Sequence, residues 1–546
     1  MFAELLLGTL FPWVVALFLS LLVILSALLI PTFVRNLAKS PKKFLVLGLI
    51  ALIGATYLRF GLVPNQHRIF YDEDRYLGYS VSFARLNKAV SLEVASLHQS
   101  VVGKPDQAVR VTIPVLHGIV LKLFGYHEAY LFNTSRIISI LLALFLSILS
   151  FQLFRSYAGA FVTFVFALFL PIVVYWSASM ALDPYFVFFT VLSFVYLHFY
   201  LRRPSHYRGV LASVAIFLLL CVRIESFILL PLMVWLTIAF RSNESQPPVQ
   251  PPDIVFLVLL VPLICIRGFA SISVIGAKWC CADSLPLEAF SIKYVTRNLL
   301  PNIMYVITGY EVPFVITIPA LWIAFTSRQY SHRFLLYWIG VFFVLYSCYY
   351  AGLFITSEYS GSYARYYLII IPPLLLLYGN FIATFLPTTA KKSRKYLAVT
   401  MLCVGMSGAV LLNNFWHYRD LVVYMPTMFN PVDQGPIYVH AYLDHVLLPK
   451  IPKGSAVIHP ITSIPYLNGH PTVYYQFFLE NDTAIQFVKD QLRHGNRVFT
   501  MNAFDCRAIP HKCDKIERSF TAQYSKLNTP ATSNIFQIYE LFLKKK

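Results

Sequence analysis

Three acidic residues and a basic one stand in a row in RIFYDEDRYLGYS, residues 68–80. Elsewhere charges are rare, since only 13% of the 546 residues are charged. A carboxylate in such a cluster can take a proton from an attacking hydroxyl, and a second can orient that hydroxyl. A solvated turn or a helix cap is the alternative interpretation. The residues of interest are Asp72, Glu73, Asp74, Arg75 and Tyr76.

Other charged residues lie at the ends of apolar runs, where charge is costly and therefore suggests function. Asp183 stands in SASMALDPYFVFF, Arg223 and Glu225 in LLLCVRIESFILLP, and Arg365 before Tyr366 in SYARYYLIIIPP. Each has a structural alternative. Asp183 before a proline is typical of a helix N-cap. The Arg223 and Glu225 side chains would pair with each other or with lipid headgroups, and Arg365 would anchor its helix at the membrane interface.

The composition indicates an integral membrane protein with many helices. Apolar residues make up 58% of the chain, the mean hydropathy is +0.65, and runs of about 18 or more apolar residues recur. The first run lacks a basic leader and a cleavage site, so we expect a retained helix. The net charge of +19 comes largely from short loops between apolar runs. This placement is typical of topology signals and argues against nucleic-acid binding.

We predict about 12 membrane-spanning helices, of which the short pair at 209–222 and 226–240 could instead form one hairpin dipping into the membrane. Alternate loops are rich in Lys and Arg and are expected to be cytoplasmic. The long loop 63–133 and all the candidate residues above then fall on the outer face. The predicted spans are 8–34, 44–62, 134–154, 159–178, 185–201, 209–222, 226–240, 254–275, 303–325, 334–355, 366–386 and 396–413.

The C-terminal segment has a different pattern. SAVIHP (455–460), RVFTM (497–501) and FQIYELFL (536–543) are predicted strands. NDTAIQFVKDQLRHG is a predicted helix that Asn481 or Asp482 caps and Gly495 ends. We therefore divide the chain into a transmembrane domain, 1–416, and an outer α/β domain, 417–546. Cys506 and Cys513 could form a disulfide there, and no Gly-rich phosphate loop is present.

The outer polar residues suit one kind of substrate, a sugar joined through phosphate to a long lipid. The phosphate is a good leaving group, so it needs a cation more than an acid, and arginine offers a fork of donors to phosphate oxygens. The acceptor hydroxyl needs a base, which a carboxylate supplies. A site between helices at the outer leaflet would leave the lipid tail in the bilayer.

The same stretches resemble a known family. YDEDRYLGYSVSFA resembles the D-E-x-x-Y motif that opens the first outer loop of type C (GT-C) glycosyltransferases, and the closer resemblance is to the dolichyl-phosphate-mannose protein mannosyltransferase and aminoarabinose lipid A transferase branch. Further similar stretches follow in family order over about residues 44–390. They include TIPVLHGIVLKLFGYHEAYLFNTSR, SMALDPYFVFFTVLSFVYLHFYLRRP, LLLCVRIESFILLPLMVWL and ARYYLIIIPPLLLLYG.

The resemblance implies roles for the candidate residues. It implies Asp72 as the base or acceptor-orienting acid, with Glu73 and Asp183 lining the same cavity. Arg223 and Arg365 would meet the lipid phosphate. Asp74 falls at the position that the motif leaves free and is expected to be solvated. The remaining substrate-binding candidates are Arg75, Tyr76, Glu225 and Tyr366.

The chain also departs from the family pattern. The family often has Lys where Arg223 stands, and the helix before residue 44 is additional. The W-W-D signature of oligosaccharyltransferases is absent, which argues against transfer of a whole glycan to Asn.

We therefore expect an integral-membrane glycosyltransferase with a GT-C-like helical fold. It would move one sugar, a hexose or pentose, from a polyprenyl-phosphate donor to a hydroxyl of a lipid, glycan or protein, with inversion. The expected location is a bacterial or archaeal cell membrane, with the site and the C-terminal domain extracytoplasmic. Paired carboxylates could hold Mg²⁺ or Mn²⁺. The alternatives are a transporter or flippase of a lipid-linked sugar, against which the lack of internal repeats and midplane polar groups argues, and a scaffold protein.

Overall fold

The described part of the chain forms two compact units in the computed structural model. Unit 1 comprises Met1–Ala16, Gln66–Leu131 and Thr427–Lys546, and unit 2 comprises Leu17–Asn65 and Phe132–Pro426. The predicted domain boundary at 416/417 lies outside the described residues and stays a prediction. The structure describes residues 5–31, 41–63, 65, 70–96, 101–103, 105, 110–247, 250–276, 291–308, 314–349, 365–385, 443, 447–501, 518–525 and 538–544.

Six described helices are long and apolar enough to cross a membrane. The protein is therefore an integral membrane protein, as its composition predicts. Each predicted span overlaps at least one described helix except 396–413, which lies outside the described residues. The six helical spans are Leu6–Ala27, Phe44–Leu62, Ala129–Phe154, Leu182–Arg202, Ile224–Asn243 and Pro251–Ile272.

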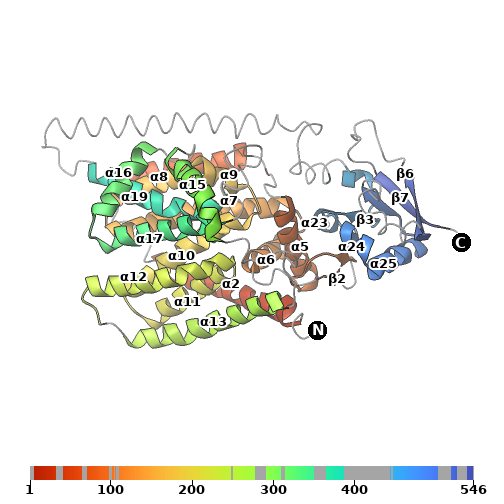
Figure 1. Ribbon diagram of the computed structural model, residues 1–546, viewed down its shortest axis with the longest axis horizontal. Coiled ribbons are helices and arrows are strands. Elements are labelled where there is room, and N and C mark those ends of the chain that lie inside the picture. Colours follow the sequence, from red (N-terminus) through yellow and green to blue (C-terminus); the bar gives the residue numbers. More distant parts are fainter. Residues whose placement is uncertain are drawn as a thin grey trace. The chain divides into compact units, whose positions relative to one another are not determined.

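Unit 2 is built from helices alone among its described residues (Figure 1). Its elements are the last part of α2 (Phe11–Ala27), α4 (Lys42–Tyr57), η2 (Leu58–Leu62), most of α7 (Ala129–Phe154), α8 (Tyr157–Phe169), α9 (Pro171–Ser177), α10 (Leu182–Arg202), α11 (His206–Leu220), η4 (Ile224–Ile228), α12 (Leu229–Asn243), α13 (Pro251–Gly276), η5 (Ile292–Tyr294), α15 (Val295–Thr308), α16 (Phe314–Thr326), α17 (Tyr330–Ser347), η6 (Arg365–Ile369) and α19 (Ile371–Phe385).

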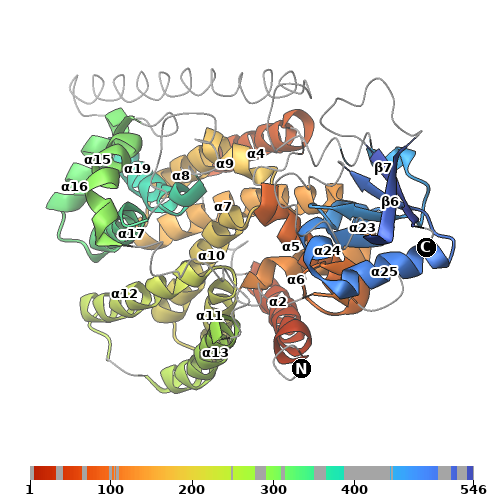
Figure 2. The same ribbon diagram turned by 45° about the vertical axis from the view of Figure 1, so that its right-hand side comes forward.

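Helix α10 is the buried centre of unit 2. It is apolar on all sides, which is typical of a helix enclosed by others, and nearly all of its residues are buried. Figures 1 and 2 show it among α7, α11, α12 and α17. Aromatic contacts join it to α7, α12 and α17; Phe194, for example, lies 4.8 Å from Trp338 of α17, measured between ring centroids. The start of α10, where Asp183 lies, is therefore held in place from several sides.

The predicted span 159–178 is wrong as a single helix. Helix α8 ends at Phe169 and α9 begins at Pro171, with Leu170 extended between them. Proline lacks an N–H and disfavours helical geometry in the residue before it, which explains the break. The buried Arg59 donates to the carbonyl oxygen of Leu168 at 2.8 Å and so satisfies one end of the interrupted helix.

Unit 1 combines part of the loop 63–133 with the C-terminal segment in one sheet. Seven strands among the described residues lie in the order β2-β1-β4-β3-β5-β7-β6, and Figure 2 shows part of this sheet, with β6 and β7 labelled. Strand β1 pairs antiparallel with β4, whereas β3 is parallel to both β4 and β5. The strands are β1 (Val94–Ala95), β2 (Val101–Val102), β3 (Ala456–His459), β4 (Thr472–Tyr474), β5 (Val498–Met501), β6 (Phe520–Tyr524) and β7 (Ile538–Leu543).

The predicted C-terminal elements agree closely with β3, β5 and β7 and with helix α25 (Asp482–Arg493). Asn481 caps α25, because its side chain accepts from the amide of Thr483 at 2.8 Å. Gly495, after the helix, has a φ of +78°, a conformation that glycine adopts without strain. The helices α24 (Tyr475–Glu480) and α25 cover an apolar core that includes Ile458 and Val473.

The remaining elements of unit 1 come mostly from the loop 63–133. Helix α5 (Phe70–Leu86) carries the acidic stretch, and α6 (Thr112–Phe124) packs closely against it. Gly118 of α6 permits this approach, because a Cβ there would lie 2.9 Å from the carbonyl oxygen of Ser80. Unit 1 also contains η1 (Leu6–Leu10), the start of α2, η9 (Leu448–Lys450) and α23 (Ser463–Leu467), which packs against α5.

Candidate functional site

The acidic stretch forms the beginning of α5 in unit 1. Asp72 and Glu73 lie in its first turn, where the helix dipole favours negative charge. Asp72 is partly exposed, Glu73 is fully buried and Arg75 is exposed. Tyr76 is buried, and its hydroxyl accepts from the guanidinium of Arg110 at 3.3 Å. This turn therefore presents one carboxylate toward solvent and keeps another inside the protein.

Asp74 is not solvated, and the expectation from the sequence is wrong here. Its exposure is 8%, and one carboxylate oxygen accepts from both the backbone N–H, at 3.2 Å, and the hydroxyl of Ser463. Ser463 is the first residue of α23, 389 positions later in the chain. No local pattern near residue 74 contains that information, so the sequence could not predict the contact.

Unit 2 brings together three of the charged residues predicted from the sequence. The Arg223 guanidinium forms an ion pair with Asp183 and a two-pronged pair with Glu225, whose oxygens lie 2.8 and 3.3 Å from Arg223 nitrogens. All three side chains are at most 12% exposed. The predicted pairing of Arg223 with Glu225 is confirmed. The contact with Asp183 joins the start of α10 to the turn between α11 and η4.

Asp183 is not the N-cap of α10, which corrects the sequence prediction. The helix begins at Leu182 with Ala181 as N-cap, and no side chain caps it. Asp183 lies in the first turn instead, where the dipole still favours a carboxylate. The cation of Arg223 binds the Asp183 carboxylate there.

Aromatic rings surround the Arg223 guanidinium. Its central carbon lies 5.5 Å from the ring of Tyr366 and 5.7 Å from that of Phe186. Tyr366 in turn lies 5.3 Å from both Tyr346 and Tyr349, measured between ring centroids. Rings at such distances stabilise a cation through their electron-rich faces. Residue 365 begins η6, but the side chain of Arg365 lies outside the described part of the structure.

The sequence analysis did not single out one buried cation near this cluster. Arg267 lies inside α13 with no exposed surface, and its Nε donates to the carbonyl oxygen of Leu220 at 2.8 Å. Leu220 ends α11, directly before the turn that carries Arg223. The available signal was a single arginine within the apolar run 254–275, since charges in such runs are rare and functional or structural.

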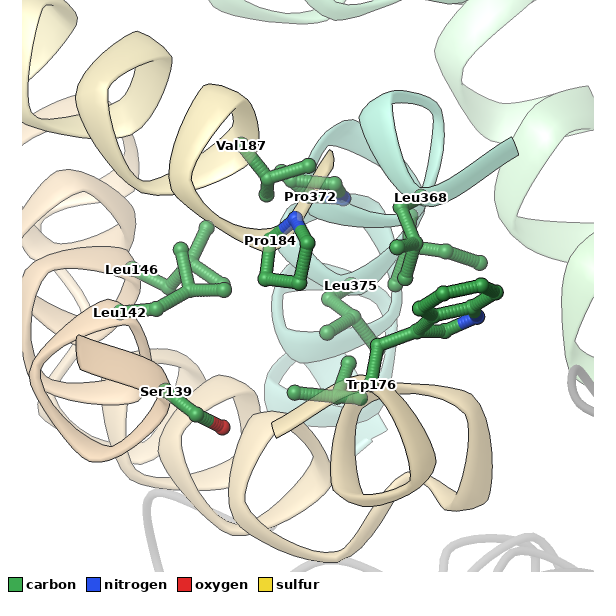
Figure 3. A pocket seen from close by; sticks show the side chains of 11 residues that line it. Ser139, Leu142, Leu146, Trp176, Pro184, Val187, Leu368, Pro372 and Leu375 are labelled. Carbon is green, nitrogen blue, oxygen red and sulfur yellow. The ribbon is translucent and has the colours of Figure 1, made fainter. Parts of the chain in front are cut away.

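A small apolar cavity lies beside the start of α10 (Figure 3). Pro184 and Trp176 lie on its wall together with Leu368 and Leu375. Its volume of about 20 Å³ leaves room for little more than one water molecule. The cavity is therefore too small for a sugar, and we assign it to packing rather than to substrate.

No group of three or more His, Cys, Asp or Glu that could hold a metal ion occurs within the residues the structure describes. In the unit 2 cluster, Asp183 and Glu225 instead share the cation of Arg223.

The sequence matches no known protein-family profile, and no curated protein matches it significantly. Its structure is similar to ArnT from Cupriavidus metallidurans in the apo state and bound to undecaprenyl phosphate, with TM-scores of 0.53 and 14% identity. Both likenesses cover 91% of this chain, and they cover 98% and 97% of those chains. An Archaeoglobus fulgidus oligosaccharyltransferase matches with a TM-score of 0.49 at 11% identity, over 92% of this chain and 74% of that one.

The likeness to ArnT covers nearly the whole of both chains, so this chain has the ArnT fold. The fold that the sequence resemblance implies is therefore confirmed.

Proposed function

We propose that this chain with the ArnT fold is a membrane glycosyltransferase. It would move one sugar from a polyprenyl-phosphate donor to an acceptor hydroxyl. The fold carries the proposal, because the similar ArnT structure was obtained bound to undecaprenyl phosphate. The chain's own residues support it, since polar groups typical of this chemistry lie at the start of α5 and around Arg223.

In the proposed reaction, the acceptor oxygen attacks the anomeric carbon of the sugar as the bond from that carbon to phosphate oxygen breaks. Asp72 takes the proton of the hydroxyl, and the lipid phosphate leaves with the bonding electrons. Attack from the opposite face inverts the anomeric centre. Asp72 suits the role of base because it is partly exposed at the start of α5, whereas the buried Glu73 suits orientation of the acceptor.

Arg223 is proposed to contact the lipid phosphate through the N–H donors that are not bound to Asp183 or Glu225. A guanidinium has five N–H donors, and three are used by Asp183 and Glu225 among the described residues. These three side chains together carry one formal negative charge when ionised. Binding of a phosphate therefore needs a second cation, the role proposed for Arg365, while Tyr366 stacks on the guanidinium. Arg75, Tyr76 and Glu225 are proposed to contact the sugar or acceptor.

The proposed site faces the outside of a bacterial or archaeal cell membrane, together with the C-terminal segment. The positive-inside distribution of Lys and Arg supports this orientation. The acceptor would be a lipid, glycan or protein hydroxyl, and the sugar a hexose or pentose.

The experiment supplies purified protein in lipid nanodiscs with a labelled polyprenyl-phosphate sugar and extracted envelope lipids or glycans. We expect transfer of label by the wild type and a loss of about 10²–10⁴-fold in Asp72→Asn, because the base is removed. Asp490→Asn, an exposed carboxylate on α25, is the matched control and should leave the rate unchanged. Transfer at the wild-type rate in the Asp72→Asn protein would show that Asp72 is not the base.

A further inference from the structure

Helix α5 is bound to α23 of the C-terminal segment at two points. Near its start, the Asp74 carboxylate accepts from the amide and hydroxyl of Ser463. Near its end, the Arg85 guanidinium lies 5.3 Å from the Tyr466 ring and donates to the carbonyl oxygen of Leu467 at 3.5 Å. Positions 74 and 85 are about three helical turns apart and therefore lie on one face of α5. Both contacts are thus made by the same side of the helix.

The contact at Ser463 occupies a special place in the sheet. Ser463 follows β3, and the next two parallel strands, β4 and β5, lie on opposite sides of β3. In sheets with this arrangement, the crevice beyond the carboxyl end of the first strand is where ligands, and anions in particular, bind. Here the carboxylate of Asp74 binds the backbone N–H at that position. The Asp74 side chain of α5 therefore occupies the crevice beyond the end of β3.

The segment 93–96, which follows α5 in the loop 63–133, is joined to the same sheet. The Tyr474 amide donates to the carbonyl oxygen of Glu93 at 2.8 Å, and Val94 pairs with Val473 in the antiparallel ladder. The Tyr466 hydroxyl also donates to the carbonyl oxygen of Ser96 at 3.2 Å. The segment that begins with Asp72 and Glu73 is therefore fixed both along its helix and at the strand that follows.

We propose that Asp74 and Ser463 are positioning residues, through which the C-terminal α/β segment holds α5 in the orientation that the transfer reaction needs. The proposal rests on the proposed function, because Asp72 and Glu73 are the groups that α5 would position. Neither Asp74 nor Ser463 needs to touch substrate in this role. Asp74 is hydrogen-bonded to the C-terminal segment and lies one residue from Glu73 on the same helix. A shift of α5 at Asp74 would therefore also move Glu73 and Asp72.

The test compares full-length Asp74→Asn, Ser463→Ala and Ser463→Thr proteins with wild type in nanodiscs. Hydrogen exchange of residues 70–86 reports on α5 without any substrate, and kcat and KM are measured with a polyprenyl-phosphate sugar. Asp490→Asn is again the matched control. Asp74→Asn keeps an acceptor oxygen but loses the charge, and Ser463→Thr keeps the hydroxyl.

We expect exchange in 70–86 to rise about tenfold in Asp74→Asn and Ser463→Ala, the effect of losing one hydrogen bond to a charged group. We expect kcat to fall about tenfold with little change in the donor KM, since orientation at the reacting centre is lost rather than binding. Ser463→Thr should behave as wild type. Unchanged exchange in both variants would overturn the proposal, and so would faster exchange with unchanged kcat.

Two further readouts separate the possible causes of failure. If Ser463→Ala also exposes β3 to exchange, Arg85→Gln breaks the second contact of α5 without altering the sheet, and it should likewise speed exchange in 70–86 and lower kcat. Normal values of both in Arg85→Gln would then count against the proposal. Absence of turnover in the wild type would refute the proposed function, whereas the exchange data would still decide whether Ser463 holds α5.

Discussion

Asp74 in unit 1 and Asp183 in unit 2 are held in different ways, although both are buried aspartates near a helix start. Two of the donors to Asp74 are the amide and hydroxyl of a serine, which carry no formal charge. Asp183 is bound by the guanidinium of Arg223, which Glu225 shares. Their exposures are similar, 8% and 4%. Burial alone therefore does not decide how a carboxylate is compensated.

The two kinds of contact are expected to differ in how much stability is lost when they are removed. When the hydrogen bonds from neutral donors to a carboxylate are removed, the free energy of unfolding falls by about 1.5–3 kcal/mol. Removing the cation of a buried ion pair costs about 3–5 kcal/mol, because a charge then remains in a medium that solvates it poorly. We therefore expect the loss of a contact in the polar cluster of unit 2 to lower the free energy of unfolding more than the loss of a contact in unit 1. Three changes test this comparison.

The largest effect is expected for Arg223→Met. The substitution removes the cation that Asp183 and Glu225 share, so we expect the free energy of unfolding to fall by about 3–5 kcal/mol. Denaturation in mixed micelles measures the change. Adding Asp183→Asn to this variant should recover part of the loss, since one of the two uncompensated charges disappears. If the double variant is less stable than Arg223→Met alone, the ion pair is not the source of the effect.

A somewhat smaller effect is expected from acidification of the sheet in unit 1. His459 is buried at the end of β3, and burial lowers its pKa to about 4 from an ordinary value of 6.5. Its Nδ1 accepts from the amide of Ile461 at 2.9 Å, a bond that protonation would break. The unfolded chain therefore binds a proton at higher pH than the folded one. Stability from this residue should be lost as pH falls from about 6.5 to 4, by about 3 kcal/mol in total.

Hydrogen exchange of β3 and β5 at several pH values measures this loss, with His459→Asn as the control. The asparagine oxygen can accept from the Ile461 amide but does not titrate. The difference in protection between pH 7 and pH 4 should therefore shrink in the variant. An equal pH dependence in the two proteins would exclude His459 as its source, and His470, whose pKa burial also lowers, would be the next residue to replace.

The smallest effect is expected at the surface of unit 1. Arg497 forms a two-pronged pair with Glu540, with distances of 2.6 and 2.7 Å, and its side chain is 45% exposed. Water and salt screen such a pair, so Arg497→Ala should cost about 0.2–1 kcal/mol. Thermal unfolding at low and high salt measures the change, which should be smaller at high salt. A loss as large as that of Arg223→Met would remove the contrast between exposed and buried pairs.

Much of the fold could be predicted from the sequence because its signals are local. Helix α25 is marked by its cap and by the glycine after it, and β3, β5 and β7 by short apolar runs. The break between α8 and α9 also has a local cause, Pro171, which the prediction of one span overlooked. The start of α10 was misplaced by two residues, since Asp183 and Pro184 resemble a cap and first position but lie further inside.

The sequence identified residues of the candidate site but only some of the contacts between them. Arg223 and Glu225 are two positions apart, so their pairing could be expected from spacing alone. The partner of Asp183 is 40 positions away and depends on how α10 and α11 pack. Arg267 was overlooked because an arginine in an apolar run has no partner that the sequence identifies.

The sequence by itself determined that this protein crosses the membrane and where helix α25 begins, because hydropathy and helix signals act over a few neighbouring residues. Only the tertiary structure decided that three adjacent acids have different surroundings. Asp72 is partly exposed and Glu73 is buried. Asp74 is bound by a serine 389 positions away. The physical reason is that a buried carboxylate needs donors, and folding supplies them from segments that no local pattern connects.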